Sequence, residues 1–268
     1  MNRLDKDTKL CVSFSSNPSN IGVKFHNYLY AKLGLNFVYK PFAPIDIEQA
    51  VAGIRGLPIR GASVSMPFKS AVIPLVDEVL ESAAAIDAVN TIVNDDGFLR
   101  AYNTDYIAVK ELIKNMRVTP VILRGSGGMA KAVAAALKDS GFTDGLILAR
   151  NREEGSRLAS KLGWRWQSEI GSETAPLLVN VTPIGMEGTD QASDLSYLYP
   201  QISAAQTVFD VVAKPSDTPL IKMARDIGKS VVTGGEVIAL QAAKQFEIYT
   251  AVKLTPELVA EARAFSQA

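Results

Sequence analysis

Two side chains able to carry chemistry, Lys69 and Asp105, each follow the end of a predicted strand. Lys69 ends the run Ser63–Lys69, in which a proline turn follows an extended stretch, and Asp105 ends the run Asn103–Asp105. A lysine can transfer the hydroxyl proton of a secondary alcohol while hydride leaves the neighbouring carbon. A nearby carboxylate raises the pKa of such a lysine, whereas partial burial lowers it. We therefore predict a catalytic pair for proton and hydride chemistry, although Asp105 also suits the N-cap of the helix that follows.

A glycine turn lies between a predicted strand at residues 121–123 and a predicted helix at residues 129–140. Its members are Gly125, Ser126, Gly127, Gly128, Met129 and Ala130. Glycines let the backbone turn tightly and approach a pyrophosphate, and the helix N-terminus supplies amide donors and a favourable dipole. A plain glycine-rich loop is the alternative, but the flanking strand and helix favour dinucleotide binding. Arg124, just ahead of the turn, could offer charge to a phosphate.

The residues after the next predicted strand, at 145–149, indicate which dinucleotide binds. An NAD site commonly has a carboxylate here, which binds the ribose hydroxyls. This chain instead has two guanidinium groups and an amide, in Arg150, Asn151 and Arg152. These groups suit the additional phosphate of NADP, and the two glutamates that follow have an ordinary first-turn role against the helix dipole. The predicted cofactor is NADP.

Composition and charge exclude several classes of protein. The 268 residues suffice for one large domain or two modest ones. The 28 basic and 28 acidic residues cancel, so charge gives no argument for nucleic acid or an anionic membrane as a partner. No apolar stretch reaches the roughly 18 residues of a membrane helix, and the polar start lacks a signal-peptide core. A single cysteine fits a reducing compartment, so we predict a cytoplasmic protein.

Several polar residues have a structural interpretation beside a functional one. Cys11 is expected to be a small buried residue of a strand. His26 is the only histidine, which excludes histidine-rich metal sites, and we expect it to be structural rather than a proton shuttle. Asn90 and Asn103 could bind substrate hydroxyls or terminate strands. We place Asn90 in the site with Asn103 as its support, and we expect no metal.

Alternating strand and helix patterns predict an α/β protein with helix-covered parallel sheets. Expected strands are residues 9–14, 37–41, 61–65, 89–93, 98–102, 121–123, 145–149, 177–181 and 208–212. Expected helices are residues 23–33, 46–55, 76–86, 104–115, 129–140, 153–162, 236–252 and 256–266. Asp46 is a candidate helix N-cap, and Asp96-Gly97 is a strong hairpin turn signal.

Two domains are expected, with an active site where strand ends of both halves converge. Residues 1–105 with 236–268 form an N-terminal α/β domain that binds substrate and carries catalysis. Residues 106–235 form a Rossmann-like, doubly wound NADP domain, and the C-terminal helices return to the first domain.

Together these motifs resemble the shikimate dehydrogenase family over nearly the whole chain. The resemblance lies in Ser63–Lys69, Ala88–Thr91, Asn103–Asp105, the glycine turn, Arg150, Asn180–Met186, Thr218–Leu220 and Gln241. It implies that Lys69 and Asp105 are catalytic and that Ser65, Asn90 and Gln241 bind a polyol. It also implies that Gly125–Met129, Arg150, Val211 and Gly234 contact NADP. The family reaction is the reversible reduction of 3-dehydroshikimate to shikimate, a step of aromatic amino-acid biosynthesis.

The chain departs from the family pattern on the substrate side. Where the family has two serines that hold the substrate carboxylate, Asn20 and Gly22 stand here, so Ser19 or Asn20 is the candidate substitute. A family asparagine becomes Ser63, and a substrate-site tyrosine becomes Ala213. Shikimate is therefore the first substrate to consider, with quinate or an amino-substituted relative as alternatives.

Two rival functions stay open. A folate-linked methylene dehydrogenase also joins a lysine-bearing domain to a dinucleotide domain, but Asn103–Asp105 and Gln241 argue against it. A non-enzymatic nucleotide sensor is the other, since the carboxylate-binding loop is altered. The expected partner is a small polyol carboxylate, and the expected state is a monomer or homodimer.

Overall fold

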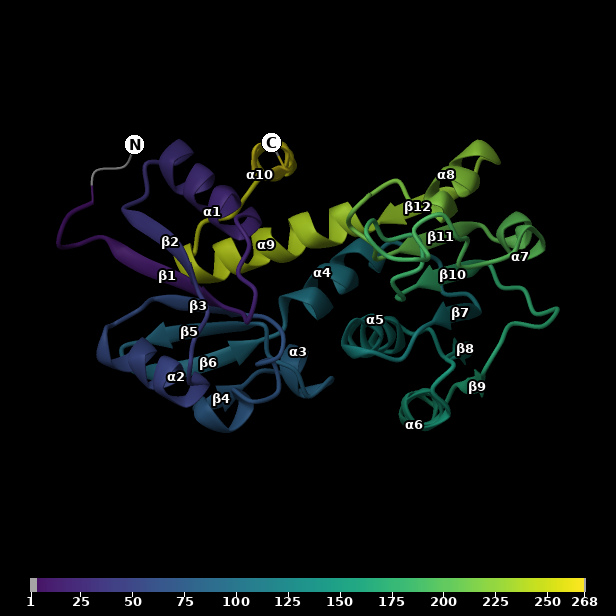
Figure 1. Ribbon diagram of the computed structural model, residues 1–268, viewed down its shortest axis with the longest axis horizontal. Helices are drawn as coiled ribbons and strands as arrows, with labels where there is room; N and C mark the ends of the chain where they lie inside the picture. Colours follow the sequence, from purple (N-terminus) through teal and green to yellow (C-terminus); the bar gives the residue numbers. More distant parts are fainter. Residues whose placement is uncertain (1–3, 268) are drawn as a thin grey trace. The chain divides into compact units, whose positions relative to one another are not determined.

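Two six-stranded sheets organise the chain, one in each of two units (Figure 1). The structure is a computed structural model that describes residues 4–267. The first unit runs to Thr104 and resumes at Ala239, and the second spans Asp105–Ile238. The chain thus leaves the first unit once and returns to it for its last two helices.

The sheet of the first unit mixes parallel and antiparallel strands in the order β2-β1-β3-β5-β6-β4. Its strands are β1 (Lys9–Phe14), β2 (Phe37–Phe42), β3 (Gly61–Val64), β4 (Glu78–Val79), β5 (Thr91–Asp95) and β6 (Phe98–Tyr102). β1 pairs in parallel with β2 and β3, whereas β5 is antiparallel to β3 and β6. Asp96 and Gly97 join β5 to β6 with positive φ angles of 53° and 95°, as the predicted hairpin turn requires.

Helices cover both faces of this sheet because side chains alternate along each strand. The helices are α1 (Ile21–Lys32), α2 (Ile47–Gly56), α3 (Glu81–Ala84), the 3-10 turn η1 (Ile73–Leu75), the later part of α9 (Gly234–Thr250) and α10 (Pro256–Gln267). Val12 of β1 packs with Ile54 of α2, whereas Cys11 packs on the other side with Leu29 of α1 and Phe246 of α9. Asp46 caps α2 as predicted, since its side chain accepts hydrogen bonds from the amides of Glu48 and Gln49.

The predicted helix at residues 76–86 is wrong. Only Glu81–Ala84 is helical, and the preceding residues form an edge strand along β6. The amide of Asp77 donates to the carbonyl of Leu99, and that of Leu80 donates to Ala101. Pairing with a strand distant in sequence therefore overrides the local helical pattern.

The sheet of the second unit is wholly parallel, in the order β12-β11-β10-β7-β8-β9. Its strands are β7 (Val121–Arg124), β8 (Gly145–Leu148), β9 (Arg165–Gln167), β10 (Leu177–Asn180), β11 (Thr207–Asp210) and β12 (Ser230–Thr233). Numbered along this unit, the order reads 3-2-1-4-5-6, the doubly wound arrangement of dinucleotide-binding domains. The strand order reverses at β7, so the end of β7 is where a ligand is expected.

Helices lie on both faces of this second sheet (Figure 1). They are α4 (Thr104–Ile113), α5 (Gly128–Asp139), α6 (Arg152–Leu162), α7 (Tyr199–Ala204) and α8 (Pro219–Asp226). Ile122 of β7 and Leu178 of β10 pack against Ile202 of α7 and Leu220 of α8. Sequence patterns did not indicate β9, β12, α7 or α8. Within residues 4–267, no helix is long and apolar enough to cross a membrane.

Candidate active site

Asn90 is the centre of a buried hydrogen-bond network in the first unit. Its side chain is 3% exposed, and Oδ1 accepts from the amide of Thr104 at 2.7 Å. The same oxygen accepts from the hydroxyls of Thr104 and Thr91 at 3.1 and 2.9 Å. These three hydrogen bonds involve Oδ1 alone, and the same side chain also carries the Nδ2 donor group. Asn90 therefore fixes the first residue of α4.

The run that carries Lys69 is anchored beside Asn90. The carbonyl of Lys69 accepts a hydrogen bond from the amide of Val89, the residue before Asn90, at 2.8 Å. At the other end of the run, the amide of Ser65 donates to the carbonyl of Phe14 of β1 at 2.9 Å. The side chain of Lys69 is half-buried, and Ser65 is exposed. Backbone hydrogen bonds thus fix the chain on both sides of the proline turn.

Asp105 directly follows Thr104, whose amide Asn90 holds. Because α4 begins at Thr104, Asp105 lies in the first turn of the helix and is not its N-cap. Its position there leaves the carboxylate near the positive end of the helix dipole. The interpretation of Asp105 as a cap is therefore wrong. Its catalytic role stays a prediction.

Two glutamines of α9 complete the network. Gln241 donates from Nε2 to Oγ1 of Thr104 at 3.1 Å. Gln245, which is 3% exposed, donates from Nε2 to Oγ of Ser63 at 3.1 Å and to Oγ1 of Thr91 at 3.0 Å. Residues four apart share one face of a helix, so both amides reach the same group of hydroxyls. The structure thereby links Asn90 and Gln241 through Thr104.

The family resemblance indicated Gln241, whereas nothing in the sequence analysis indicated Gln245. The available signal was a second glutamine one helical turn later, among alanines and a phenylalanine of an otherwise apolar face.

Ser19 and Asn20 stand at the start of α1, and both are exposed. Asn20 occupies the N-cap position, yet its side chain makes no capping hydrogen bond. A Cβ atom added at Gly22 would lie 3.6 Å from the hydroxyl oxygen of Tyr39, an ordinary contact. A side chain at residue 22 is therefore sterically possible, and its absence removes a polar group from this loop. The substrate-binding roles of Ser19 and Asn20 stay predictions.

His26 and Cys11 are buried within the first unit, as expected for structural residues. The imidazole is 1% exposed and stacks on the ring of Tyr39, with 4.4 Å between centroids. Burial lowers the pKa of His26 to about 3, against a smaller opposing effect of a hydrogen bond with Gln245. Burial also raises the pKa of the Cys11 thiol to about 12. Both groups are therefore neutral at physiological pH.

The glycine turn of the second unit leaves its backbone accessible. Gly125 has a φ of +129°, and an added Cβ would lie 2.7 Å from Cγ2 of Val181, so only glycine fits. Side chains added at Gly127 and Gly128 would meet nothing within 4 Å. Gly127 is the N-cap of α5 and supplies no side-chain cap, which leaves the first-turn amides for an anion. These features fit a dinucleotide pyrophosphate.

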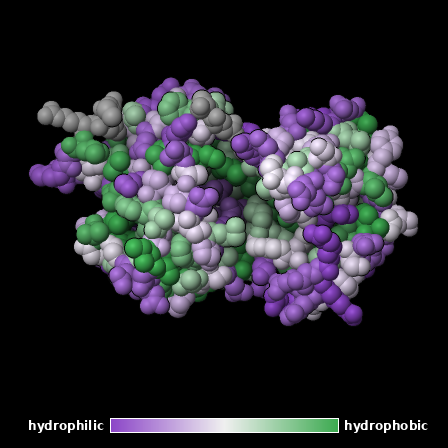
Figure 2. Space-filling model, viewed as in Figure 1, coloured by the Kyte–Doolittle hydropathy of each residue, from purple (hydrophilic) through white to green (hydrophobic). Residues whose placement is uncertain are grey.

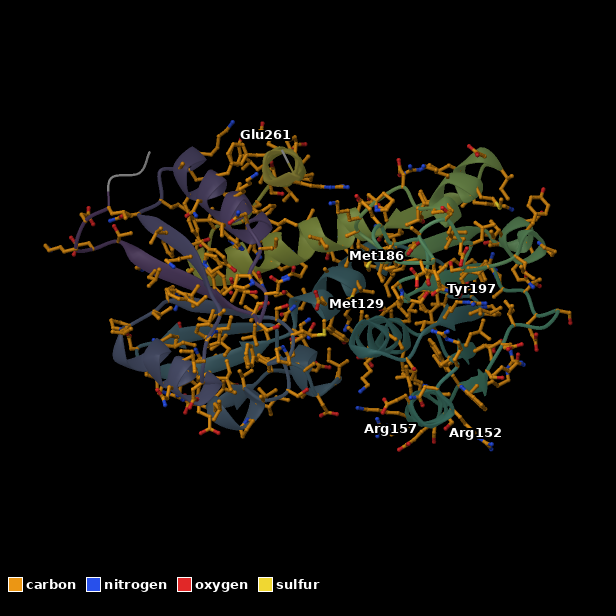
Figure 3. The ribbon with its side chains drawn as sticks, in the orientation of Figure 1. Met129, Arg152, Arg157, Met186, Tyr197 and Glu261 are labelled. Carbon is orange, nitrogen blue, oxygen red and sulfur yellow. The ribbon has the colours of Figure 1, made fainter. Side chains whose placement is uncertain are left out.

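Ser126 and Met129 are half-buried around this turn, and Ala130 is buried. Figure 3 labels Met129 at the start of α5.

The end of β8 presents Arg150, Asn151 and Arg152, all exposed. Oδ1 of Asn151 accepts from the amide of Glu154 at 3.1 Å and so caps α6. The guanidinium of Arg152 lies 6.0 Å from the ring centroid of Trp166. Glu154 pairs with Lys131 and Arg157. Hydrophilic residues gather over α6 (Figure 2), and Figure 3 labels Arg152 and Arg157 there. Asn151 thus has a capping role beside its predicted contact with phosphate.

Val211 and Gly234, both expected at the cofactor, are brought together. A Cβ atom at Gly234 would lie 2.3 Å from the carbonyl oxygens of Val211 and Val212. Glycine is therefore needed for this close approach of two backbone segments. Thr233 and Glu236 cap the start of α9 reciprocally, with Oε2 of Glu236 accepting from the Thr233 amide at 2.8 Å.

A buried carboxylate that sequence patterns did not indicate holds the loop after β11. Asp210 is fully buried, and Oδ1 accepts from the amide of Val212 and from Nδ2 of Asn180, both at 3.0 Å. Its Oδ2 accepts from Oγ1 of Thr218 at 2.7 Å. Burial raises the pKa of Asp210 to about 6, against these three hydrogen bonds. Asp210 thereby fixes the backbone that carries Val211.

The doubly wound sheet, its glycine turn and the lysine-bearing α/β unit define a two-domain oxidoreductase of the dinucleotide-dependent class. Residues 19–92 match the shikimate dehydrogenase substrate binding domain. A shikimate dehydrogenase-like protein of Haemophilus influenzae is 52% identical over 267 residues, which is 98% of each chain. The chain belongs to the shikimate dehydrogenase family, as its motifs predicted.

Two further comparisons agree. The NADP(+)-dependent shikimate dehydrogenase of Halothermothrix orenii is 32% identical over 257 residues, covering 87% of this chain and 86% of that one. A solved structure of a shikimate 5-dehydrogenase-like protein is 52% identical and has a TM-score of 0.98. The match covers 99% of this chain and 100% of that chain. The predicted α/β class is confirmed.

Within residues 4–267, no group of three histidine, cysteine or carboxylate side chains is placed to hold a metal ion.

Proposed function

We propose that this protein catalyses the reversible NADP-dependent oxidation of shikimate, or of a close cyclic polyol acid such as quinate, to its 3-dehydro form. The observation that carries the proposal is the network in which Asn90, Thr104 and Gln241 fix the start of α4 beside the anchored Lys69 segment. Amide and hydroxyl groups next to a lysine suit a polyhydroxylated substrate. The name of the Halothermothrix orenii relative supports both the substrate and NADP.

Residues of the first unit, together with Asp105 of the second, share the roles in substrate binding and catalysis. Lys69 takes the proton of the reacting hydroxyl through Nζ and returns it in the reverse direction. Asp105 orients the substrate hydroxyl and the lysine. Asn90 donates to a substrate hydroxyl from Nδ2, and Gln241 offers its side-chain carbonyl oxygen. Ser65, Ser19 and Asn20 are the remaining substrate contacts in this proposal.

The residues of the second unit hold the cofactor, which accepts or returns a hydride when it is bound. The turn from Gly125 to Ala130 and the first-turn amides of α5 bind the pyrophosphate. Arg150, Asn151 and Arg152 bind the phosphate on the adenosine ribose. Val211 and Gly234 contact the same dinucleotide further along the sheet edge. Asp210 acts indirectly, by holding the backbone of Val211 and Val212.

A panel of cyclic polyol acids with both cofactors tests the proposal most directly. The full chain is incubated with NADP⁺ or NAD⁺ and with shikimate, quinate or an amino-substituted relative, and cofactor reduction is followed. We expect reduction of NADP⁺ with at least shikimate. If the protein binds NADP⁺ but reduces it with none of these substrates, the dehydrogenase proposal fails and a nucleotide-sensing role replaces it.

We also propose a cytoplasmic protein that acts as a monomer or homodimer. The support is compositional, since the single cysteine is buried and no intrachain disulfide is possible.

A further inference from the structure

Arg124 is a half-buried cation at the glycine turn that no carboxylate of the described chain neutralises. It is the last residue of β7 and immediately precedes Gly125. Its Nε is buried and, within residues 4–267, has no hydrogen-bond partner. The carbon of the guanidinium lies 5.4 Å from the ring centroid of Tyr197. The charge is therefore held in place without an anion.

The ring of Tyr197, which contacts the guanidinium of Arg124, is itself fixed by burial and hydrogen bonds. Tyr197, labelled in Figure 3, is 1% exposed, and its hydroxyl lies 3.0 Å from the carbonyl oxygen of Ile122 and 2.8 Å from that of Val179. Ile122 and Arg124 are two residues apart on β7, so their side chains share the face on which Tyr197 packs. The aromatic ring thus holds the guanidinium of the last residue of β7, the strand at which the strand order reverses.

This arrangement is unfavourable without a ligand. A buried donor that lacks an acceptor destabilises the folded protein, and it does so more strongly when the group is charged. The cation–π contact with Tyr197 offsets only part of this cost, because it supplies no hydrogen-bond acceptor. A small apolar residue at the end of a central parallel strand would avoid the penalty altogether. An anion supplied by a ligand resolves the imbalance, because a guanidinium binds phosphate through two parallel hydrogen bonds.

We propose that Arg124 binds a phosphate group of the dinucleotide. This inference rests on the proposed function, which places NADP at the same strand ends. Two phosphate sources lie within that ligand: the pyrophosphate, next to Gly125, and the phosphate on the adenosine ribose, near Arg150. Arg124 is in register with Leu148 of β8, and Leu148 lies two residues before Arg150. A guanidinium at this position suits either of the two phosphate groups, because both offer the same charged oxygen acceptors.

Binding of four probes to the full chain tests the proposal by calorimetry, without reference to turnover. The probes are NADP⁺, NAD⁺, ADP-ribose and 2′-phosphoadenosine 5′-phosphate. We expect Arg124→Leu to weaken NADP⁺ roughly tenfold or more, and Arg124→Lys to weaken it less, since lysine keeps the charge but not the planar fork. Weaker NAD⁺ and ADP-ribose binding identifies the pyrophosphate, whereas weakening confined to the two 2′-phosphorylated probes identifies the ribose phosphate.

Arg225→Leu is the matched control. It removes the same charge from the same unit, at an exposed side chain of α8 that pairs with Asp217. This control should bind all four probes as the parent does. If Arg124→Leu also binds all four within about twofold of the parent, the proposal is overturned.

The thermal midpoint of the ligand-free protein separates a ligand role from a structural one. We expect Arg124→Leu to melt at or above the parent midpoint, because the unpartnered Nε is removed. A lowered midpoint with unchanged affinities would show that Arg124 only packs on Tyr197, and would overturn the proposal. Should Arg124→Leu not fold, Arg124→Gln replaces it with the same expectations. A parent protein that binds no NADP⁺ would refute the proposed function itself, which is a distinguishable result.

Discussion

Gln241 and Thr104 are joined by a hydrogen bond of 3.1 Å from Nε2 to Oγ1, across 137 positions of sequence. Thr104 is also the residue whose amide and hydroxyl are held by Asn90. A residue near the end of the chain therefore helps to fix the backbone immediately before Asp105. The candidate site of the first unit is built by this convergence of two loops and one helix.

Replacement of Lys69 by alanine should lower kcat by about 10²- to 10⁴-fold with shikimate, because the hydroxyl proton loses its acceptor. Asp105→Ala should lower it as well, with the larger part of the effect in kcat. Initial rates across a range of shikimate at saturating NADP⁺ measure this. Lys32→Ala, which removes an exposed lysine paired with Glu261, is the control. If both Lys69→Ala and Asp105→Ala keep the kcat of the parent, these two residues are not the catalytic pair.

Gln241 and Gln245 should have separable roles although they share one helix face. Gln245→Leu should destabilise folding by about 1–3 kcal/mol, since it leaves Ser63 and Thr91 without their buried donor. Gln241→Leu should instead raise KM for the polyol with a smaller loss of stability. Chemical denaturation and steady-state kinetics on the two variants measure both quantities. The reverse pattern would contradict the substrate role of Gln241.

Arg150→Leu should weaken NADP⁺ roughly tenfold or more while changing NAD⁺ little, because only NADP⁺ carries the ribose phosphate. The affinities are compared by titration calorimetry. Arg157→Leu serves as the control, since it removes an exposed arginine of α6 that pairs with Glu154. Equal losses for the two cofactors would refute the phosphate role of Arg150.

His26 should make the parent lose stability as the pH falls. Its pKa is about 3 in the folded protein and near 6.5 unfolded, so the unfolded chain binds the extra proton between these values. The contribution is complete above pH 6.5 and is lost by about 1.4 kcal/mol per pH unit below it, down to about pH 3. Denaturation of the parent and of His26→Phe across this range isolates the effect. A constant difference between the two proteins would show that His26 does not titrate on unfolding.

Local signals predicted the parts of the fold that depend on neighbouring residues. The Asp46 cap, the Asp96-Gly97 turn and the glycine turn each arise from backbone needs that a few adjacent residues satisfy. The missed strands β4, β9 and β12 have two to four residues each and exist through pairing with distant partners. Strands this short show too few residues for an alternating hydrophobic pattern to be recognised in the sequence.

The candidate site divides in the same way. Lys69, Asn90 and the glycine turn lie in motifs that sequence alone indicates, whereas Gln245 and Asp210 matter through partners far along the chain. Gln245 reaches Ser63 across 182 positions, and only the packing of α9 shows that contact. Asp210 acts on the Val211 loop because it is buried, a property that its sequence neighbours do not reveal.

The return of the chain to its first unit has a consequence for biosynthesis. The core on one face of the first sheet contains Phe246, Tyr249 and Ala262, which belong to the last two helices. The ribosome therefore synthesises all of residues 105–238 before it synthesises the segment from Ala239 onward, which completes the first unit. Domains usually mature in the order of their synthesis, but here the later one has its complete sequence first. Until the last two helices are synthesised, the apolar face formed by β1 and α1 stays uncovered. During synthesis this face is the surface that a chaperone would have to protect.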